Sequence, residues 1–357
     1  MSRIVFAWEL RDNHGHLWRL LPLAIEMRSR GHEVAFGLRS MTAAQRYLAP
    51  TGIRWLACPM SAGAVLPGRE IASYTDILAI HGATRPDLLG GMVQGWLNPY
   101  ALLGVDLVVI EHNPFALLAA RRARIPSVQV GTDFTIAPTL SPAPCFRSWQ
   151  PGHVEAQKQT GEAVRRTVQS LFDKPYSLGQ LLTVDHTRGL SVPELDHYAA
   201  FRPPGTTFLG PAPAPYQGST QTSSQSRRPR IFAYLYLQPW MEAVLGALDA
   251  TGAEVIVVIA ALEADWSPRY PTLRFYRRPV QLAPLLAECT LAVTHAGHGT
   301  TADCLLADVP MVHLRLHIEQ LLAAERLAAT GAGLGLRPTH VGTGFANVLG
   351  EVLRNPR

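Results

Sequence analysis

One block near the C-terminus restricts the fold of this chain more than any other feature. Residues 291–294 form a short apolar run, a loop with two glycines follows, and a helical pattern opens at Thr300 and Thr301. Beyond that predicted helix come an Asp-Val-Pro turn, a second apolar run at 311–314, and a helix that ends at Gly331. Short apolar strands that alternate with helices are typical of a parallel sheet covered by helices. The block therefore predicts an α/β fold.

The loop in this block has the composition of a phosphate-binding turn. Gly297 and Gly299 let the backbone approach a ligand closely. The first N–H groups of the following helix lie at the positive end of its dipole and attract an anion. His295 and the hydroxyl of Thr300 would add two further contacts. The loop predicts a site for the diphosphate of a sugar nucleotide; the alternative is an ordinary turn whose glycines only permit tight packing.

The order of these residues resembles the signature of the family 1 glycosyltransferases. In that signature a His-x-Gly-x-Gly-Ser/Thr loop leads to Gly-Val-Pro and then to an acid–amide pair. The matching residues are His295, Gly297, Gly299, Thr300, Val309, Pro310, Glu319 and Gln320. The resemblance implies that the loop holds the donor diphosphate and that Glu319 and Gln320 bind the hydroxyls of the donor sugar. It further implies that Val280 contacts the nucleotide base and that Asp303 lies near the ribose.

A second candidate site follows the first predicted strand. The turn at residues 9–16 ends in Gly15-His16, and the resemblance implies that His16 takes a proton from the acceptor hydroxyl. Histidine suits this role because its ordinary pKa lies near working pH. The resemblance also places an acid at the end of a later strand, where this chain has Glu111 instead of the more frequent Asp. His14 is the second candidate for the base, and packing or helix capping is the alternative role for both histidines.

The chain divides at a change of composition. Residues 210–230 begin with alternating Pro and Ala and continue as a Gln/Ser/Thr tract, which is typical of a solvated linker. Strand and helix signals alternate on both sides of this segment. We expect an N-terminal acceptor-binding Rossmann-like domain over residues 1–210, a linker over 211–229, and a C-terminal nucleotide-sugar-binding domain over 230–357. The resemblance implies the GT-B architecture, in which two Rossmann-like domains face each other across a cleft.

Composition and charge exclude several classes of protein. Apolar residues make up 47% of the chain and charged residues 17%, which argues against disorder. The net charge of +5 is scattered without a basic block, so a nucleic-acid partner is not expected, and peripheral contact with anionic lipid is possible but unsupported. Four widely separated cysteines, a strand at the very N-terminus and the lack of a long apolar run predict a cytoplasmic protein without a transmembrane segment.

The acceptor site is expected in the loops of the N-terminal half, at residues 60–100 and 132–155, because binding loops vary on a constant scaffold. Five aromatic residues of these segments either line an apolar acceptor pocket or belong to the core: Trp96, Tyr100, Phe134, Phe146 and Trp149.

Together these features predict an inverting glycosyltransferase. It would move a hexose or deoxyhexose from a UDP- or dTDP-sugar to a hydroxyl of a small, partly apolar acceptor. We expect no cofactor and no metal, because the sequence has no Asp-x-Asp and a helix N-terminus can stabilise the leaving diphosphate. Two alternatives stay open: a UDP-sugar 2-epimerase of the same fold, and a catalytically silent sugar-nucleotide-binding partner. A dinucleotide oxidoreductase is disfavoured because no Gly-x-Gly-x-x-Gly follows the first strand.

Overall fold

The chain forms two compact units. The computed structural model describes residues 1–10, 15–61, 63–64, 66, 68–147, 149–150, 152–211, 228–259 and 266–354. One unit comprises Met1–Pro193 and Tyr198–Pro213, and the other comprises Glu194–His197 and Ala214–Arg357. His14, the alternative base, and most of the predicted linker lie outside the described residues.

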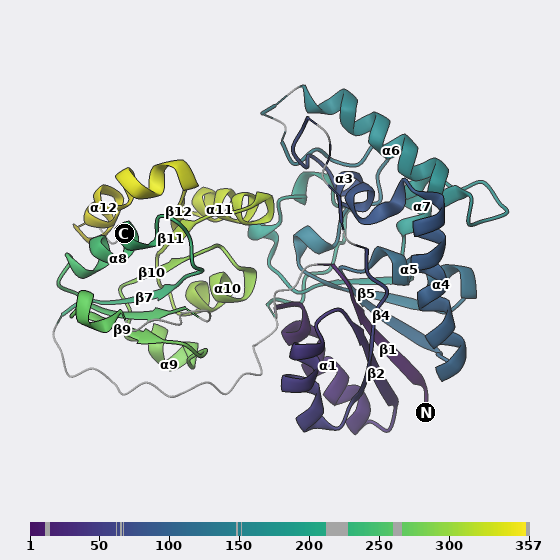
Figure 1. The fold of residues 1–357 in the computed structure, drawn as a ribbon, viewed down its shortest axis with the longest axis horizontal. Helices are drawn as coiled ribbons and strands as arrows, with labels where there is room; N and C mark the ends of the chain where they lie inside the picture. Colours follow the sequence, from purple (N-terminus) through teal and green to yellow (C-terminus); the bar gives the residue numbers. More distant parts are fainter. Residues whose placement is uncertain are drawn as a thin grey trace. The chain divides into compact units, whose positions relative to one another are not determined.

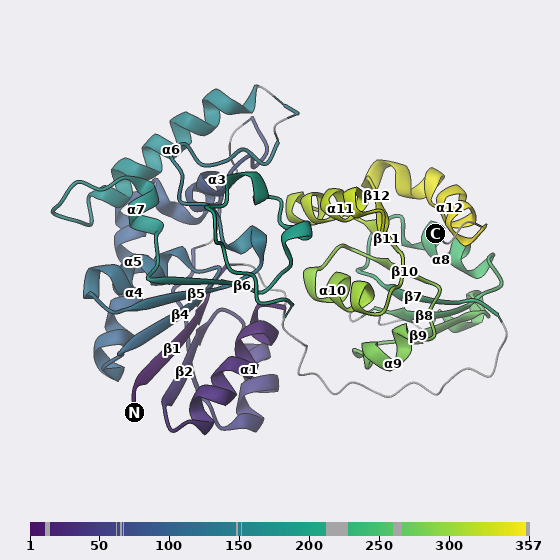
Figure 2. The ribbon, with the colours of Figure 1, turned by 180° about the vertical axis from the view of Figure 1, so that it is seen from behind.

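The first unit is built on a parallel sheet with the strand order β3-β2-β1-β4-β5-β6 (Figures 1 and 2). Its strands are β1 (Arg3–Trp8), β2 (Glu33–Leu38), β3 (Arg54–Ala57), β4 (Leu107–Glu111), β5 (Ser127–Gly131) and β6 (His186–Gly189). The direction in which strands are added reverses between β1 and β4. In an open parallel sheet, ligands bind beyond the carboxyl ends of the strands at such a switch point. The residues that follow β1 and β4 therefore lie where a ligand is expected to bind.

Helices cover both faces of this sheet, with α1 on one face and α4 and α5 on the other (Figure 1). Alternate residues of β1 pack against α1: Ile4, Phe6 and Trp8 are buried together with Leu17 and Leu20. This packing follows from the two-residue repeat of a strand and the amphipathic face of a helix. The helices of the unit are α1 (Gly15–Ser29), α2 (Met41–Ala43), α3 (Tyr74–Leu78), α4 (Pro86–Leu103), α5 (Pro114–Ala123), α6 (His153–Gln169) and α7 (Leu178–Leu182).

The second unit repeats the arrangement with the strand order β12-β11-β10-β7-β8-β9. Its strands are β7 (Arg230–Tyr234), β8 (Glu254–Val258), β9 (Leu273–Tyr276), β10 (Leu291–Thr294), β11 (Met311–Leu314) and β12 (Gly333–Leu336). Its helices are α8 (Met241–Asp249), α9 (Leu282–Leu286), α10 (His298–Leu306), α11 (Ile318–Thr330) and α12 (Pro338–Arg354). Here the order reverses between β7 and β10, so the residues after these two strands lie at the switch point.

Two buried strands of the C-terminal block, β10 and β11, have the bounds that the sequence predicts, and α11 ends at Gly331 with a left-handed φ of 79°. The predicted start of α10 at Thr300 was wrong, because the helix begins two residues earlier, at His298. Gly297 takes the N-cap position with φ −69° and ψ 127°, and glycine is readily accepted there. Gly299 therefore belongs to the first turn of the helix rather than to the loop.

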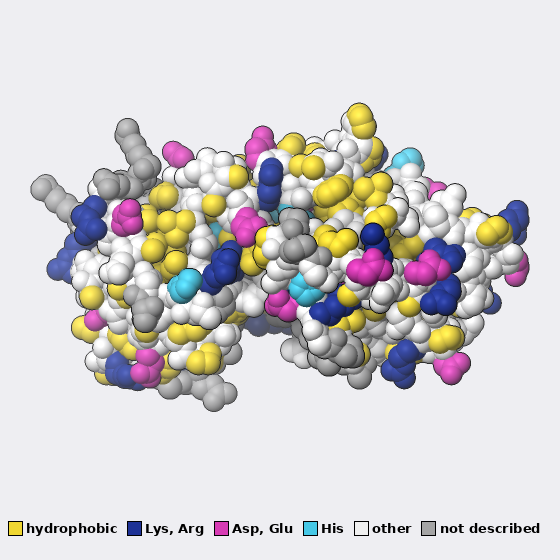
Figure 3. Space-filling view, turned by 90° about the horizontal axis from the view of Figure 1, so that it is seen from above, with side chains coloured by type: hydrophobic (Ala, Val, Ile, Leu, Met, Phe, Trp, Pro, Cys, Tyr) yellow, Lys and Arg dark blue, Asp and Glu magenta, His cyan; other side chains and the backbone are white. Residues whose placement is uncertain are grey.

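The surface shows the scattered charge that the sequence predicts. Basic and acidic side chains are interspersed over the face drawn in Figure 3. The four cysteines are free thiols: Cys58, Cys145, Cys289 and Cys304. Within the described residues, no helix has the length and apolar character needed to span a bilayer.

Candidate active site

The switch point of the first unit brings His16 and Glu111 together. His16 is the second residue of α1, and Glu111 is the last residue of β4. Strands β1 and β4 are parallel neighbours, and Trp8 stands in register with Glu111. Two residues that are 95 positions apart therefore form a hydrogen bond. The pairing that the resemblance implied is present, and the catalytic roles stay predictions.

Three side chains form one network at this point. The Nδ1 of His16 bonds to Oε2 of Glu111. Arg19 donates to the other carboxylate oxygen, with its Nε 3.2 Å and its Nη2 2.8 Å from Oε1. Arg19 was not among the predicted site residues, although its position three residues after His16 places both on one face of a helix. A search for charged residues at that spacing from the histidine would have found it.

The network holds Glu111 as a carboxylate. Its side chain is fully buried, and burial alone would raise the pKa of Glu111. The charge that His16 carries when it is protonated, the permanent charge of Arg19 and the hydrogen bond from His16 together outweigh burial and hold the pKa of Glu111 well below its usual range. An ionised carboxylate only accepts hydrogen bonds, so the proton of the neutral His16 ring belongs on Nδ1. The other ring nitrogen, Nε2, is then the proton acceptor.

The Nε2 atom of His16 is buried and has no hydrogen-bond partner among the described residues. The ring of His16 is stacked on Trp8 with the ring centroids 5.4 Å apart, and the centroid of the His112 ring lies 5.6 Å from that of His16. These two rings pack against the ring of His16. A buried nitrogen left without a partner is costly, and the hydroxyl of a bound substrate would satisfy it.

The end of β5 leaves room for the Glu111 carboxylate because residue 131 is a glycine. A Cβ atom at Gly131 would collide with the hydroxyl of Thr135 and would lie 3.4 Å from Oε1 of Glu111. On the next loop, Asn113 caps α5 by accepting a hydrogen bond of 2.9 Å from the N–H of Ala116. Gly131 thus leaves space beside the carboxylate, and Asn113 fixes the start of the helix that follows it.

In the second unit, the predicted phosphate loop lies at the start of α10. No side chain of the described residues caps this helix, and the first N–H groups of a helix have no intrahelical partner. A Cβ atom at Gly297 or Gly299 would meet no atom within 4 Å, and neither glycine has a positive φ. Packing and backbone conformation therefore do not require glycine at these positions. This observation disfavours the alternative in which the glycines only permit tight packing.

His295 is held by the backbone at both ring nitrogens. Nδ1 bonds to the carbonyl oxygen of Leu314, and Nε2 accepts the N–H of Tyr236 at 2.9 Å. The ring of Tyr236 is stacked on it, with the centroids 4.8 Å apart. Burial lowers the pKa of His295 to about 4, although the bond to Leu314 opposes this shift, so the ring is neutral at pH 7. Contact between His295 and a phosphate stays a prediction, and it would compete with the bond from Tyr236.

The other predicted donor residues lie on α10, on α11 and after β9 in the second unit. Thr300 is half-buried in the first turn of α10, and Asp303 lies one turn further, where burial raises its pKa. Glu319 lies in the first turn of α11, next to Gln320, whose side-chain oxygen accepts the N–H of Leu316 at 2.7 Å. Because β10 and β11 are parallel neighbours, the loops before α10 and α11 lie at one edge of the sheet. Val280 is buried and follows β9, the last strand at one side of the sheet.

Most of the aromatic residues expected in an acceptor pocket belong to the core. Trp96, Tyr100, Phe134 and Phe146 are buried, whereas Trp149 is 46% exposed. A recess of about 530 Å³, including its open mouth, is lined instead by residues of α3, α5, α7 and the loop after β5. It is largely apolar, with polar groups contributed by residues such as Tyr74, Thr75, Asn113, Gln129 and Thr139.

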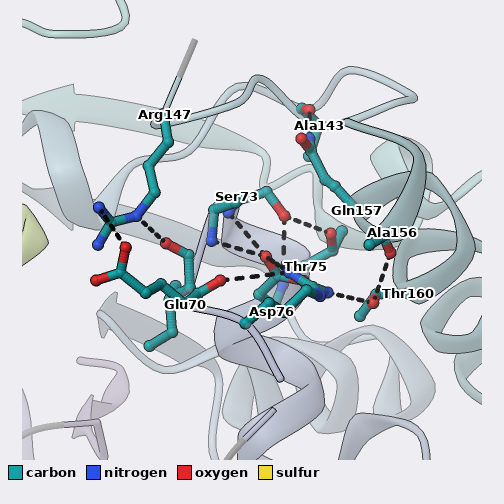
Figure 4. Close-up of polar contacts among 12 residues, drawn as sticks. Glu70, Ser73, Thr75, Asp76, Ala143, Arg147, Ala156, Gln157 and Thr160 are labelled. Carbon is teal, nitrogen blue, oxygen red and sulfur yellow. Dashed lines mark hydrogen bonds and ion pairs between the residues drawn. The ribbon is translucent and has the colours of Figure 1, made fainter. Parts of the chain in front are cut away.

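A polar network fixes one wall of this recess (Figure 4). Asp76 on α3 accepts two bonds from Arg69, at 2.8 and 2.5 Å, and Arg69 also reaches Thr160 on α6. Arg147 donates to the carbonyl of Ile71 at 2.9 Å, and the side-chain amide of Gln157 donates to the carbonyl of Ala143. The network connects three segments of the chain, namely residues 69–76, the loop at 143–147 and α6. It therefore holds Thr75 and Ala143, which line the recess, in place.

Comparison with known proteins gives partial matches in sequence and full-length matches in structure. No family model matches the chain. An L-demethylnoviosyl transferase of Streptomyces niveus is 31% identical over 134 residues, which are 37% of this chain and 34% of that protein. The TDP-daunosamine transferase DnrS of Streptomyces peucetius is 29% identical over 116 residues, 32% of this chain and 27% of that protein. The matches thus span about a third of the length of these curated relatives or less.

Solved structures match over nearly the whole chain. The calicheamicin glycosyltransferase CalG4 has a TM-score of 0.73 and 19% identity, with 99% of this chain and 90% of that chain covered. The glycosyltransferase SsfS6 of Streptomyces sp. SF2575, complexed with thymidine diphosphate, has a TM-score of 0.64 and 19% identity, with 98% and 91% covered. At this level of identity the likeness shows the fold alone. With its two Rossmann-like units, the chain has the GT-B fold of these glycosyltransferases, as the sequence predicts.

Proposed function

We propose that this protein is an inverting glycosyltransferase that moves a hexose or deoxyhexose from a nucleotide sugar to a hydroxyl of a small natural-product acceptor. The observation that carries this proposal is the arrangement of His16, whose Nδ1 is tied to an ionised Glu111 while its Nε2 is buried without a partner among the described residues. A histidine held in this way is suited to remove a proton from an attacking hydroxyl. Glu111 then stabilises the imidazolium that forms.

The donor would be held by the second unit and the acceptor by the first. Support for the donor side comes from the open N-terminus of α10 and from two glycines that neither packing nor conformation requires. As the bond to the sugar breaks, the diphosphate gains negative charge, which a helix N-terminus stabilises. This stabilisation needs no metal, so we propose a metal-independent reaction. Attack of the activated hydroxyl opposite the leaving diphosphate would invert the anomeric centre.

We propose thymidine diphosphate as the carrier in the donor. The support is that one relative is named a TDP-daunosamine transferase and that one structural neighbour was solved with thymidine diphosphate. A thermal-shift panel of dTDP, UDP, GDP, ADP and NAD tests this choice, because a ligand that binds the native state raises its melting temperature by mass action. We expect the largest rise with dTDP. A rise with NAD alone, or with none of them, would contradict the proposed donor site.

Transfer itself is tested with His16→Ala. We expect the variant to lose transfer of sugar from a dTDP-sugar to a panel of phenolic and macrocyclic alcohols while it keeps its thermal shift with dTDP. EDTA should leave wild-type transfer unchanged. Conversion of a UDP-sugar to its 2-epimer without an acceptor would favour the epimerase alternative. Binding of dTDP without any transfer would favour the silent partner protein.

A further inference from the structure

We propose that Arg19 is a positioning residue that aims the Glu111 carboxylate at His16 and keeps His16 in its proton-accepting form at neutral pH. The inference rests on the proposed function, because it concerns the same candidate base. It adds a third side chain to the His–Glu pair, and it predicts how the pair responds to pH.

The geometry divides the two carboxylate oxygens between two partners. Arg19 places two nitrogens of its guanidinium group on Oε1 of Glu111, at 3.2 and 2.8 Å, which leaves Oε2 to His16. The side chain of Arg19 is 12% exposed and that of Glu111 is 0% exposed, so solvent screens this ion pair little. Both donors of this planar group hold the same oxygen, so Arg19 at Oε1 and His16 at Oε2 together fix the rotation of the carboxylate. With Glu111 so fixed, its Oε2 sets the direction of the His16 ring.

The charges of His16, Glu111 and Arg19 explain how Arg19 affects the protonation of His16. A buried carboxylate beside a histidine, with no other partner, favours the imidazolium, because the two then form a neutral pair. An imidazolium cannot accept a proton. Arg19 already balances the charge of Glu111, and its Nη2 lies 3.0 Å from Nδ1 of His16. Protonation of His16 would give this buried group a net positive charge, which desolvation disfavours.

Among the described residues, the groups around His16 come from four places in the chain. Trp8 on β1 is uncharged, Arg19 lies on α1, Glu111 ends β4, and His112 follows in the loop with its ring centroid 5.6 Å from that of His16. A protonated His112 would act in the same direction as Arg19. Arg19 is the permanent cation of this set, so its removal is the clean test.

The alternative is that Arg19 only ties α1 to β4 and has no effect on the titration of His16. A titration separates the two roles without any assay of transfer. The imidazole resonances of ¹³C/¹⁵N-histidine-labelled protein are followed from pH 4 to 9, and the His16 signal is identified by its loss in His16→Gln. In Arg19→Met we expect the titration midpoint of His16 to rise by about one pH unit or more. Arg28→Met is the control, because Arg28 is an exposed arginine on the same helix, and it should leave the midpoint unchanged.

Two further variants keep the proposal testable if Arg19→Met does not fold. Arg19→Lys keeps the charge without the two-pronged geometry, so the midpoint should stay near that of the wild type while kcat falls. Glu111→Gln removes the negative charge and keeps Arg19, so the midpoint should fall below that of the wild type. An unchanged midpoint in both Arg19→Met and Glu111→Gln would overturn the inference. A wild type without transferase activity would instead contradict the proposed function. The titration would still decide whether Arg19 affects the protonation of His16, because it does not depend on transfer.

In the kinetic counterpart, kcat/KM is measured against pH. The acid limb of the Arg19→Met profile should move to higher pH by the same interval as the midpoint of His16. A uniform loss of rate at every pH, with the limb in place, would mean that Arg19 acts only on structure.

Discussion

Each unit places a histidine at the switch point of its sheet, but after different strands and with different partners. His16 follows β1 and lies beside the end of β4, whereas His295 follows β10 and lies beside the chain that leaves β7. His16 meets a carboxylate and a guanidinium, and one of its ring nitrogens has no partner among the described residues. Both nitrogens of His295 are used by the backbone. The first arrangement suits the proposed proton transfer, and the second fixes the loop that carries Tyr236.

The comparison shows that residue type and location at a switch point do not by themselves assign a role to a histidine. A carboxylate partner favours a strong proton acceptor, because it stabilises the imidazolium that the reaction forms. A backbone carbonyl and a backbone N–H instead favour the neutral ring. Burial then lowers the pKa of His295 to about 4, far from the pH of an efficient base.

The largest expected effect concerns the candidate base. His16→Ala should lower kcat by roughly 10²–10⁴-fold, the usual contribution of general-base catalysis. The thermal shift with dTDP should stay at the wild-type value, because the donor loop lies in the second unit. His295→Ala is the matched comparison, and it should lower the melting temperature and the dTDP shift more than His16→Ala does. Equal losses of kcat in the two variants would contradict the difference between the two histidines.

Removal of the carboxylate should reduce stability next. Glu111→Gln leaves Arg19 without its buried counter-charge, and breaking one side of a buried ion pair typically costs about 3–5 kcal/mol. Because Arg19 is 12% exposed and the amide oxygen of the new side chain can still accept its hydrogen bonds, we expect the lower end of that range. Urea unfolding at pH 7 measures the change. A loss below about 1 kcal/mol, the range of surface pairs, would mean that solvent screens the cluster.

The same variant should change how stability depends on pH. The folded-state pKa of Glu111 is held below its ordinary value of about 4.3, so its contribution is fully present above that pH. The contribution is lost as the pH falls from there toward the folded-state pKa. We therefore expect the wild type to lose more stability than Glu111→Gln between about pH 5 and pH 3. Parallel stability curves for the two proteins in this range would contradict the depressed pKa.

His295→Phe should have a smaller effect on stability. It leaves the N–H of Tyr236 and the carbonyl of Leu314 without their partner, and a buried unpaired group costs about 1–3 kcal/mol. The lowered pKa of His295 also means that its contribution is present above the ordinary histidine pKa of about 6.5 and is lost as the pH falls toward about 4. The pH dependence of unfolding between those values should weaken in the variant. It should not vanish, because burial lowers the pKa of His313 to about 3 in the same sheet.

The smallest expected effect on stability comes from the donor loop. Gly297→Ala adds a methyl group in open space at a φ of −69°, so the free energy of unfolding should change by no more than about 0.5 kcal/mol. Affinity for dTDP should nevertheless fall, because the methyl group occupies space that a phosphate needs. Calorimetric titration with dTDP measures this loss. Unchanged affinity for dTDP, or a large loss of stability, would indicate that Gly297 serves packing rather than phosphate binding.

Parts of the candidate site followed from local sequence. The loop of His295, Gly297 and Gly299 between an apolar strand and a helix predicts the phosphate turn, and Gly15-His16 after the first strand is the pair through which the resemblance predicts the base. The partners of these residues were harder to predict from the sequence. Glu111 was named through a resemblance, Arg19 was missed, and the bonds of His295 to Tyr236 and Leu314 had no sequence signal, because backbone groups carry none.

The residues of the acceptor pocket were still harder to predict from the sequence. Trp96 and Tyr100 lie in a segment where a pocket was considered, and they are core residues that donate to Glu9 and to the carbonyl of Ala116. Whether an aromatic residue faces a recess or the core depends on which helices pack on which face of the sheet. The recess is lined by pieces of α3, α5, α7 and a loop that are far apart along the chain.

The sequence by itself determined the α/β class, the buried strands β10 and β11, the candidate phosphate turn and the choice of His16 and His295 as candidate site residues. Each of these depends on residues within about one strand and one helix of each other, where periodicity and glycine chemistry act locally. The tertiary structure decided which charges surround each histidine. The reason is physical: parallel strands that are neighbours in a sheet can be far apart along the chain, and only their pairing brings Glu111 to His16 and Arg19.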